Sequence, residues 1–281
     1  ADFKIITGLT VTVPNGGEKW DVASAQNITW ICTSAQVNVP QVKLEYSTDG
    51  GATYPYIIAA AGNTGTYAWT VPDTISASFK VRVGDLADST AYDVSDANAK
   101  IRAKFTVTAP NGGEIWTVSE SRNITWTTVG TVANVKLDYS MNDFTSATQI
   151  TASTPNTGTF AWTVPDSIST TVKVRVMSAT DSDAFDASDA NFKIRGAFGV
   201  TAPNGGELWL INQNNNITWT TTGTIANVKL MYSVDGGLTY PNTIVASALN
   251  ANSYTWLIPD SPTPIARMRV SDASDATVYD D

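Results

Sequence analysis

The chain has 281 residues, 42% of them hydrophobic and 10% aromatic, so it can bury a sizeable core divided among two or three domains. Its net charge of -9 and its lack of Lys and Arg clusters argue against nucleic acid or an anionic membrane as a partner. No apolar run approaches the roughly 20 residues that span a bilayer. There is no histidine and one cysteine, Cys32, so we predict that the protein is not an enzyme and has no cofactor.

The first five residues, ADFKI, copy a segment that occurs twice more. It reads ANAKI from Ala97 and ANFKI from Ala190, where it ends one repeat and leads directly into the next. Residues 1–8 are therefore predicted to be a donor strand without a domain of its own. The predicted polymerisation strand consists of Ala1, Asp2, Phe3, Lys4 and Ile5.

Internal repetition dominates the rest of the chain. The phrases PNGGE and NITW each occur three times, beginning at Pro14, Pro110 and Pro203 and at Asn27, Asn123 and Asn216. Both markers recur after 96 and then 93 residues, and VKLEYS, VKLDYS and VKLMYS follow at matching places. We predict three copies of one domain, spanning residues 9–103, 104–196 and 197–281.

Within each copy the hydrophobic period is two, as strands require. In NITWTT, Ile124 and Trp126 would face one side of a strand while Asn123 and Thr125 face the other. About seven short strands per roughly 95 residues are typical of an immunoglobulin-like β-sandwich. We predict an all-β chain of three tandem sandwiches held by apolar packing, because the cysteine pair of antibody domains is absent.

The nine tryptophans fall at three equivalent places in every copy. They are Trp20, Trp116 and Trp209 after PNGGE, Trp30, Trp126 and Trp219 in NITW, and Trp69, Trp162 and Trp256 before VPD or IPD. Their alternation with Ile and Val predicts core anchors that bury a large aromatic area. The alternative is a set of exposed sugar-stacking platforms, as in a carbohydrate-binding module.

Each NIT triplet is an N-glycosylation sequon, at Asn27, Asn123 and Asn216. The alternation that turns Ile and Trp inward points each Asn to solvent, so glycosylation is sterically possible. The alternative is recurrence through duplication alone, because most bacteria do not read this sequon whereas archaea and eukaryotes do.

Two turns, STDGGATY from Ser47 and SVDGGLTY from Ser233, resemble the Asp-box of sialidases and related β-propellers. In that motif, Asp and Gly satisfy backbone groups of a hairpin turn. The second copy reads SMNDFTSA from Ser140 and has lost the motif, which favours an interchangeable surface turn over a catalytic element.

Acidic clusters recur beside the final strands of each copy. Asp93 and Asp96 match Asp186 and Asp189, and such carboxylates could hold Ca²⁺ at a domain junction. The alternative is a solvated acidic loop with Asx-turns. Paired carboxylates could also serve a glycosidase, but their place in repeated loops argues against this.

The series PNGGE-x-W, NITW, VKLxYS-x-DGG-x-TY, W-TVPD, VRV and SDA-x-F-KI resembles the immunoglobulin-like repeat of large extracellular bacterial and archaeal proteins. That repeat is related to the Ser/Thr-rich, GPI-anchored fungal cell-wall family associated with β-glucan assembly. The resemblance covers nearly all of the chain, three times over. It implies an extracellular or cell-surface location and a role as spacer, adhesive stalk or anchoring module, and it supplies no catalytic residues.

The third copy stops at VYDD, without the counterpart of residues 97–101 or 190–194, and ADFKI is that segment. We therefore expect the N-terminal strand of one copy to complete the third sandwich of the next, which builds a head-to-tail homopolymer. The expected function is a structural subunit of an extracellular filament, pilus-like thread or surface array. The alternatives are a window from a longer covalent array, and an adhesin stalk or carbohydrate-binding module that contacts cell-surface polysaccharide.

Overall fold

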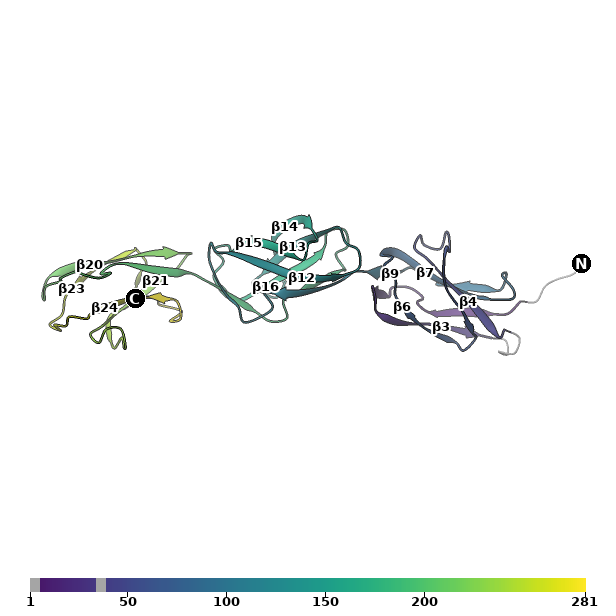
Figure 1. Ribbon diagram of the computed structural model, residues 1–281, viewed down its shortest axis with the longest axis horizontal. Coiled ribbons are helices and arrows are strands. Elements are labelled where there is room, and N and C mark those ends of the chain that lie inside the picture. Colours follow the sequence, from purple (N-terminus) through teal and green to yellow (C-terminus); the bar gives the residue numbers. More distant parts are fainter. Residues whose placement is uncertain (1–5, 34–38) are drawn as a thin grey trace, which may run out of the picture.

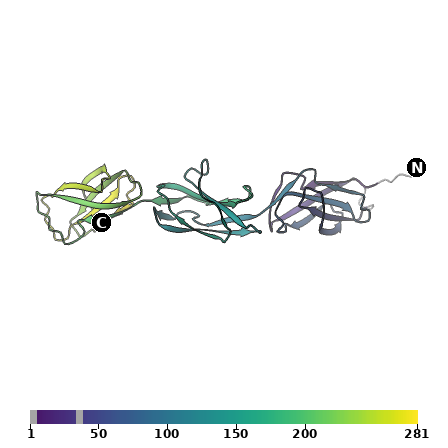
Figure 2. The same cartoon turned by 90° about the horizontal axis from the view of Figure 1, so that it is seen from above.

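Residues 6–33 and 39–281 are described by the computed structural model of the chain, and the structural statements below concern them. They form strands and no helix. The strands build three sandwiches, which lie in line as an extended rod (Figure 1, Figure 2). The prediction of an all-β chain of tandem immunoglobulin-like sandwiches is confirmed. Within the described ranges, no helix has the length and apolar character to cross a bilayer.

The first sandwich consists of two facing sheets. Its strands are β1 (Leu9–Val13), β2 (Lys19–Asp21), β3 (Ala25–Cys32), β4 (Gln41–Ser47), β5 (Tyr56–Gly62), β6 (Thr66–Thr70), β7 (Ser76–Asp85), β8 (Tyr92–Val94) and β9 (Ala99–Arg102). One sheet has the order β1-β3-β6, and the other has the order β2-β9-β7-β4-β5 with β8 paired to β7. The last strand, β9, lies between two others, parallel to β2 and antiparallel to β7.

The second sandwich repeats this plan strand for strand. Its strands are β10 (Lys104–Ala109), β11 (Ile115–Thr117), β12 (Ser121–Val129), β13 (Asn134–Ser140), β14 (Thr148–Pro155), β15 (Thr159–Thr163), β16 (Ser169–Ser178), β17 (Phe185–Ala187) and β18 (Phe192–Arg195). The sheets have the orders β10-β12-β15 and β11-β18-β16-β13-β14, with β17 paired to β16. Only Ala103 separates β9 from β10, so one domain leads into the next without a linker.

The third sandwich is incomplete within residues 197–281, all of which the structure describes. Its strands are β19 (Ala197–Ala202), β20 (Asn214–Thr222), β21 (Asn227–Ser233), β22 (Asn242–Leu249), β23 (Ser253–Leu257), β24 (Arg267–Asp272) and β25 (Tyr279–Asp280). The sheet β19-β20-β23 is intact, but the other has only four strands, in the order β22-β21-β24-β25. The prediction that the third sandwich lacks its last strand is confirmed.

Alternation along the strands places one tryptophan of each copy at the centre of its core. In β3, Ile28 and Trp30 are buried, and the indole N–H of Trp30 donates to the Asn63 side-chain oxygen at 2.7 Å. The same bond joins Trp126 to Asn156 and Trp219 to Asn250, at 2.7 and 2.8 Å. A buried indole therefore has its polar group satisfied, as core burial requires.

The other tryptophans also pack inward. Six of the nine are buried, namely Trp20, Trp30, Trp116, Trp126, Trp162 and Trp219. Trp69, Trp209 and Trp256 are partly buried and pack against the cores. The prediction of core anchors is confirmed, and no tryptophan is laid open as a sugar platform.

The turn after β4 is held by three side chains. Ser47 donates to Asp49 at 2.5 Å, and Asp49 accepts from both the N–H and the hydroxyl of Thr53. These bonds, that from Ser47 most, hold the pKa of Asp49 well below its usual range. Ser233, Asp235 and Thr239 repeat the arrangement in the third copy.

The second copy keeps this turn with different residues. Asn142 accepts from the Ser140 hydroxyl and the Ser146 N–H, at 2.9 and 3.0 Å. Asp143 and Phe144 adopt the left-handed conformation that two glycines adopt in the first copy. The motif is lost but the turn is kept, because an amide oxygen accepts the bonds that a carboxylate accepts elsewhere, which agrees with an interchangeable surface turn.

Replacing Trp126 with alanine should lower the free energy of unfolding of the middle sandwich by roughly 3 to 5 kcal/mol, because it opens a core cavity. Hydrogen exchange of β12 to β16 reports this sandwich separately from its neighbours. Ile115→Ala, at an exposed position of the same sandwich, is the matched control and should cost below about 0.5 kcal/mol. A loss below about 1 kcal/mol for Trp126→Ala would contradict the core assignment.

Candidate strand-acceptor site and domain joints

The third sandwich has an open position in its second sheet. In the first two sandwiches β9 or β18 fills this position, parallel to β2 or β11 and antiparallel to β7 or β16. In the third sandwich both neighbours are reduced. β24 has 6 residues where β7 and β16 have 10 each, and residues 208–210, the counterpart of β2, form no strand. Both edges lack the ladder partner that would extend them.

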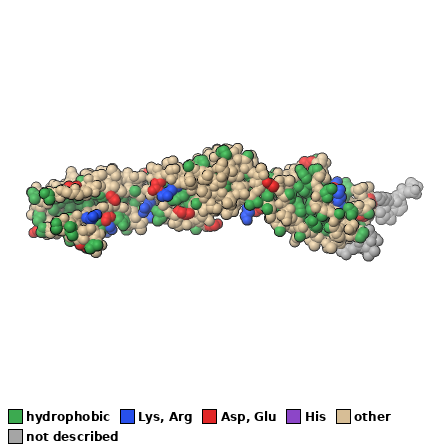
Figure 3. Space-filling model, in the orientation of Figure 1, with side chains coloured by type: hydrophobic (Ala, Val, Ile, Leu, Met, Phe, Trp, Pro, Cys, Tyr) green, Lys and Arg blue, Asp and Glu red, His purple; other side chains and the backbone are tan. Residues whose placement is uncertain are grey.

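This open position exposes side chains whose counterparts are buried. Ala266 stands at the place of Phe79 and Val172, which are fully buried, yet Ala266 is exposed. Trp209 and Trp256, with ring centroids 6.2 Å apart, are only partly covered. They line a groove of about 1140 Å³, together with Tyr232, Ile258, Arg267 and Met268. Figure 3 shows hydrophobic side chains gathered at this end of the rod, on the left.

Backbone groups beside the groove also lack partners. In the first sandwich, Ala97 N–H donates to Asn15 O, Gly17 N–H to Asn98 O, Lys100 N–H to Glu18 O and Val22 N–H to Arg102 O, at 2.8 to 3.2 Å. The second sandwich makes the same four bonds. Their counterparts in the third are Asn204 O, Gly206 N–H, Glu207 O and Ile211 N–H, and none has a backbone partner among the described residues. An incoming strand therefore meets two free donors and two free acceptors.

Gly205 points to the same missing strand. A Cβ on Gly16 would lie 2.6 Å from Ala97 Cβ, and a Cβ on Gly112 would lie 2.6 Å from Ala190 Cβ. A Cβ on Gly205 would meet nothing within 4 Å. Its φ of 119° itself favours glycine, but the close neighbour that excludes a side chain in the other copies is not among the described residues.

The predicted polymerisation strand, Ala1 to Ile5, lies outside the described residues. The description begins at Ile6, whose side chain is 50% exposed, and β1 starts three residues later. In the repeat, Ile6 stands at the place of Arg102 and Arg195.

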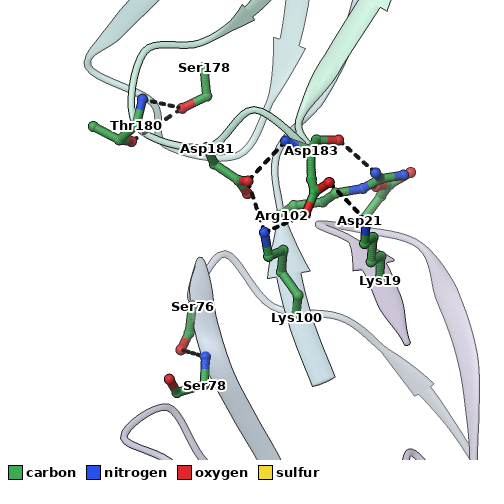
Figure 4. Close-up of polar contacts among 10 residues, drawn as sticks. All are labelled: Lys19, Asp21, Ser76, Ser78, Lys100, Arg102, Ser178, Thr180, Asp181 and Asp183. Carbon is green, nitrogen blue, oxygen red and sulfur yellow. Dashed lines mark hydrogen bonds and ion pairs between the residues drawn. The ribbon is translucent and has the colours of Figure 1, made fainter. Parts of the chain in front are cut away.

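The joint between the first and second sandwiches is held by charged side chains (Figure 4). Lys100 on β9 donates to Asp181 at 2.9 Å and to Asp183 at 2.7 Å, and Lys19 on β2 donates to Asp183 at 2.8 Å. These hydrogen bonds, that from Lys100 first, lower the pKa of Asp183 to about 2. The same contacts raise the pKa of Lys100. These residues were not predicted, although a lysine in each KI segment and an acidic residue in the following repeat are a signal in the sequence.

Arg102 extends the charged joint. Its guanidinium donates to the Asp21 carboxylate and to the Asp183 carbonyl, each at 2.7 Å. At the second joint, Lys193 forms an ion pair with Asp275, and Arg195 donates to the Thr277 carbonyl at 3.3 Å. At both joints the last strand of one sandwich, β9 or β18, therefore holds the loop that precedes β17 or β25 in the next sandwich.

A second contact holds each joint from the other side. The N–H and hydroxyl of Thr131 both donate to Asp73, at 3.0 and 2.6 Å, and Thr224 makes the same pair of bonds to Asp166, at 2.9 and 2.5 Å. A Cβ on Gly130 would lie 3.1 Å from a Val22 methyl group, so the two sandwiches approach closely. Two separate contacts restrain bending at each joint.

The four carboxylates predicted as calcium ligands have protein partners instead. Asp93 accepts the N–H of Val11 at 2.7 Å, which fastens β1, and Asp96 accepts the side-chain amide of Asn15 at 2.8 Å. Asp186 and Asp189 do the same with Val107 and Asn111. Within the described ranges, no three His, Cys, Asp or Glu side chains are grouped to hold a metal ion. The calcium prediction has no support from this geometry.

The sequon asparagines, Asn27, Asn123 and Asn216, are all exposed. They lie on β3, β12 and β20, the central strands of the three-stranded sheets. The sequon threonine is tied to its neighbour, since the hydroxyls of Thr29 and Thr12 are 2.6 Å apart. Because all three asparagines are exposed, each side chain is accessible on the outer face of its sheet.

Comparisons with known proteins identify no family. No protein-family model matches the chain, and no curated protein matches its sequence. The resemblance to the extracellular repeat therefore stays a prediction.

Solved structures similar to this chain consist of fibronectin-III-like and immunoglobulin domains. Fibronectin(III)-like modules of Clostridium thermocellum CbhA are 18% identical, over 66% of this chain and 93% of that one, with a TM-score of 0.24. The N-terminal four Ig domains of Dscam1 isoform 6.44 are 8% identical, over 99% and 72%, with a TM-score of 0.31. A three-Ig fragment of a titin E-to-A variant is 10% identical, over 95% and 94%, with a TM-score of 0.31. Similarity this low says nothing of activity or partners.

The ionic joint should tolerate a wide pH range. Asp183 has a pKa of about 2, lowered from 3.8, so its contribution is complete above pH 3.8 and is lost as the pH falls through about 2. The pKa of Lys100 is raised above 10.5, so its contribution is complete below pH 10.5 and is lost at higher pH. Small-angle scattering should show the same rod from roughly pH 4 to 10 and a more flexible chain near pH 1.5, with circular dichroism verifying folded sandwiches.

Asp183→Asn should reproduce that flexibility at neutral pH. Glu120→Gln, which removes an ion pair within one sandwich, is the matched control. An unchanged scattering profile for Asp183→Asn would show that the ion pairs do not hold the joint.

If the sequons are used, the tryptic peptides that contain Asn27, Asn123 and Asn216 should each carry extra glycan mass in protein from the native source. The expectation follows from their exposure on equivalent strands. Mass spectrometry before and after glycosidase treatment measures the glycan mass on each peptide. Unmodified peptides at all three sites would contradict the prediction that the sequons are glycosylated.

Proposed function

We propose that this protein is a structural subunit of an extracellular filament, pilus-like thread or surface array. Copies assemble head to tail, and residues 1–5 of one copy enter the open groove of the third sandwich of another. Many cell-surface domains are β-sandwiches of this architecture, which fits a structural or adhesive module. The groove is the single observation that carries the proposal.

A sandwich with one strand missing has an unsatisfied edge. Unpaired strand edges recruit further strands. β-strand addition supplies backbone hydrogen bonds along the edge and places alternate side chains in pockets. Such a site needs two features, and the third sandwich has both. Its four unpaired backbone groups can bond an incoming strand, and the partly covered Trp209 and Trp256 can contact the side chains of that strand.

Residues 1–6 match the missing strand position by position. Ala1 stands at the place of Ala97, Lys4 at that of Lys100 and Ile6 at that of Arg102. Their backbone would supply all four missing partners, because the bonds in the first sandwich come from residues 97, 98, 100 and 102. In this register the Ala1 side chain would lie against Gly205.

The shape of the rod favours an open polymer. The first and third sandwiches lie at opposite ends of the rod (Figure 1). A contact between two different surfaces whose repeat does not close into a ring builds a filament. The exposed sequons are compatible with a glycosylated surface protein.

Two other functions remain as outcomes of experiment. A covalent array of more than three repeats would fill the groove with its own continuing chain. An adhesin stalk or carbohydrate-binding module would bind cell-surface polysaccharide. The six buried tryptophans offer no platform for it, and only Trp209 and Trp256 line the groove.

The chain with Phe3→Asp and Ile5→Asp should form no filaments in negative-stain images, because both changes place a charge where the repeat has a buried apolar side chain. An excess of the peptide ADFKIITG should shorten wild-type filaments by capping growing ends. Ile57→Asp, at an exposed position on β5, is the matched control and should assemble normally. The third sandwich should be the protease-sensitive part of the unassembled chain.

Mass on denatured material separates the alternatives. Filaments joined by strand addition should yield a chain near 29.9 kDa in SDS, plus any glycan. Species far above that mass would favour a covalent array. Filaments that persist in the Phe3→Asp, Ile5→Asp variant would contradict strand addition.

A further inference from the structure

Three segments of the chain have the pattern of the missing strand. They are residues 97–102 (ANAKIR), residues 190–195 (ANFKIR) and residues 1–6 (ADFKII). They differ chiefly at the third place, which is Ala99, Phe192 or Phe3, and at the sixth, which is Arg102, Arg195 or Ile6. These two places are where the third sandwich can discriminate between strands.

The third place faces a residue of complementary size. Phe79 on β7 is the register partner of Ala99, and Val172 on β16 is the register partner of Phe192. All four are buried. Each pair thus includes one phenylalanine, contributed by either the last strand or its neighbour.

The third sandwich has Ala266 at this position. A strand carrying alanine there would set two small side chains against each other and leave a cavity, which destabilises a core. A strand carrying phenylalanine would fill the space. Phe3 and Phe192 meet this requirement, and Ala99 does not.

The sixth place faces the strand on the other side. Parallel pairing sets Asp21 opposite Arg102, and the two form an ion pair at 2.7 Å. In the third sandwich Leu210 replaces that aspartate and is 70% exposed. An arginine opposite Leu210 has no carboxylate there, whereas an apolar side chain would remove apolar surface from water. Ile6, which is 50% exposed, meets this requirement. Arg195 lies opposite Thr117 in the second sandwich, so a missing carboxylate does not by itself exclude an arginine, and the preference rests on the apolar surface of Leu210.

We infer that Ala266 and Leu210 are specificity residues that select residues 1–6 of a second copy over both internal last strands. Ala266 rejects the strand of the first sandwich, and the apolar surface of Leu210 favours Ile6 over the arginine of either internal strand. The inference rests on the proposed function, since it presupposes that a strand enters the groove.

Two leucines also replace charged residues at the surface that faces the next copy. Lys19, which reaches Asp183 across the first joint, has Leu208 as its counterpart in the third sandwich, and Leu208 is 95% exposed. Leu208 and Leu210 thus present apolar surface where the first sandwich presents a lysine and an aspartate. At these two places the joint between copies is apolar where the first internal joint is ionic, whereas Lys4 keeps the place of Lys100.

Peptide binding to one chain tests the selection. The receptor is the full chain carrying Phe3→Asp and Ile5→Asp, so that it cannot donate its own strand. The probes are peptides of residues 1–8, 97–104 and 190–197, which contain no tryptophan. Binding is followed by the fluorescence of the chain, because Trp209 and Trp256 line the groove.

The peptide of residues 1–8 should bind about tenfold or more tightly than either internal peptide, as expected when a pocket loses apolar contacts. Leu210→Asp in the receptor should reverse the preference between this peptide and the same peptide carrying Ile6→Arg, since it restores the Asp21–Arg102 pairing. Leu249→Asp, at an exposed position on β22 outside the groove, should leave the order unchanged.

The outcomes distinguish this inference from the proposed function. Equal binding of all three peptides, or an unchanged order in Leu210→Asp, would overturn the selection while leaving strand addition intact. No binding of any peptide, with the receptor folded by circular dichroism, would overturn strand addition and the selection together.

Discussion

Each sandwich depends on the insertion of one strand between two others. In the first sandwich, β9 pairs with β2 on one side and β7 on the other, and it joins the PNGGE turn to the sheet through backbone hydrogen bonds. Where this strand is missing, the effects occur together: β24 is short, residues 208–210 leave the sheet, and Ala266 is exposed. A single ladder thus accounts for the completeness of two domains and the open groove of the third.

The same strand orients the next domain. β9 continues into β10 through the single residue Ala103, which already packs in the second core. No flexible linker therefore separates the two sandwiches. Lys100 and Arg102 then reach forward to Asp181 and Asp183. Completion of one sandwich and alignment of the next are therefore coupled, which is why the three sandwiches lie in line.

Much of the fold could be predicted from the sequence because its two strongest signals are local. Alternation in NITW fixes which side chains enter the core, and the recurrence of ANAKI and ANFKI marks the strand that the third copy lacks. The joint contacts are different, because Lys100 and Asp183 are far apart in sequence and meet only when two folded domains are oriented. Clustered carboxylates were equally ambiguous, since Asp93 serves to accept a backbone N–H and no pattern of acidic residues reveals that.

The turn after β13 shows a further limit. Asn142 accepts the hydrogen bonds that Asp49 accepts in the first copy. Asp143 and Phe144 adopt the left-handed conformation that Gly50 and Gly51 adopt there. The loss of Asp and Gly removes the motif but not the turn, because the turn requires only an oxygen at one point and a left-handed backbone at the next two.

The direct passage of β9 into β10 also has a mechanical consequence. The strands run lengthwise along the rod (Figure 1), so a pull on its two ends acts along β9 rather than across it. Tension in that direction shears the hydrogen bonds to β2 and β7 simultaneously, because no bond can open before its neighbours are loaded. Peeling the strand from one end would break them singly and need less force. A force along the rod would therefore act in shear on the hydrogen bonds of β9 and β18.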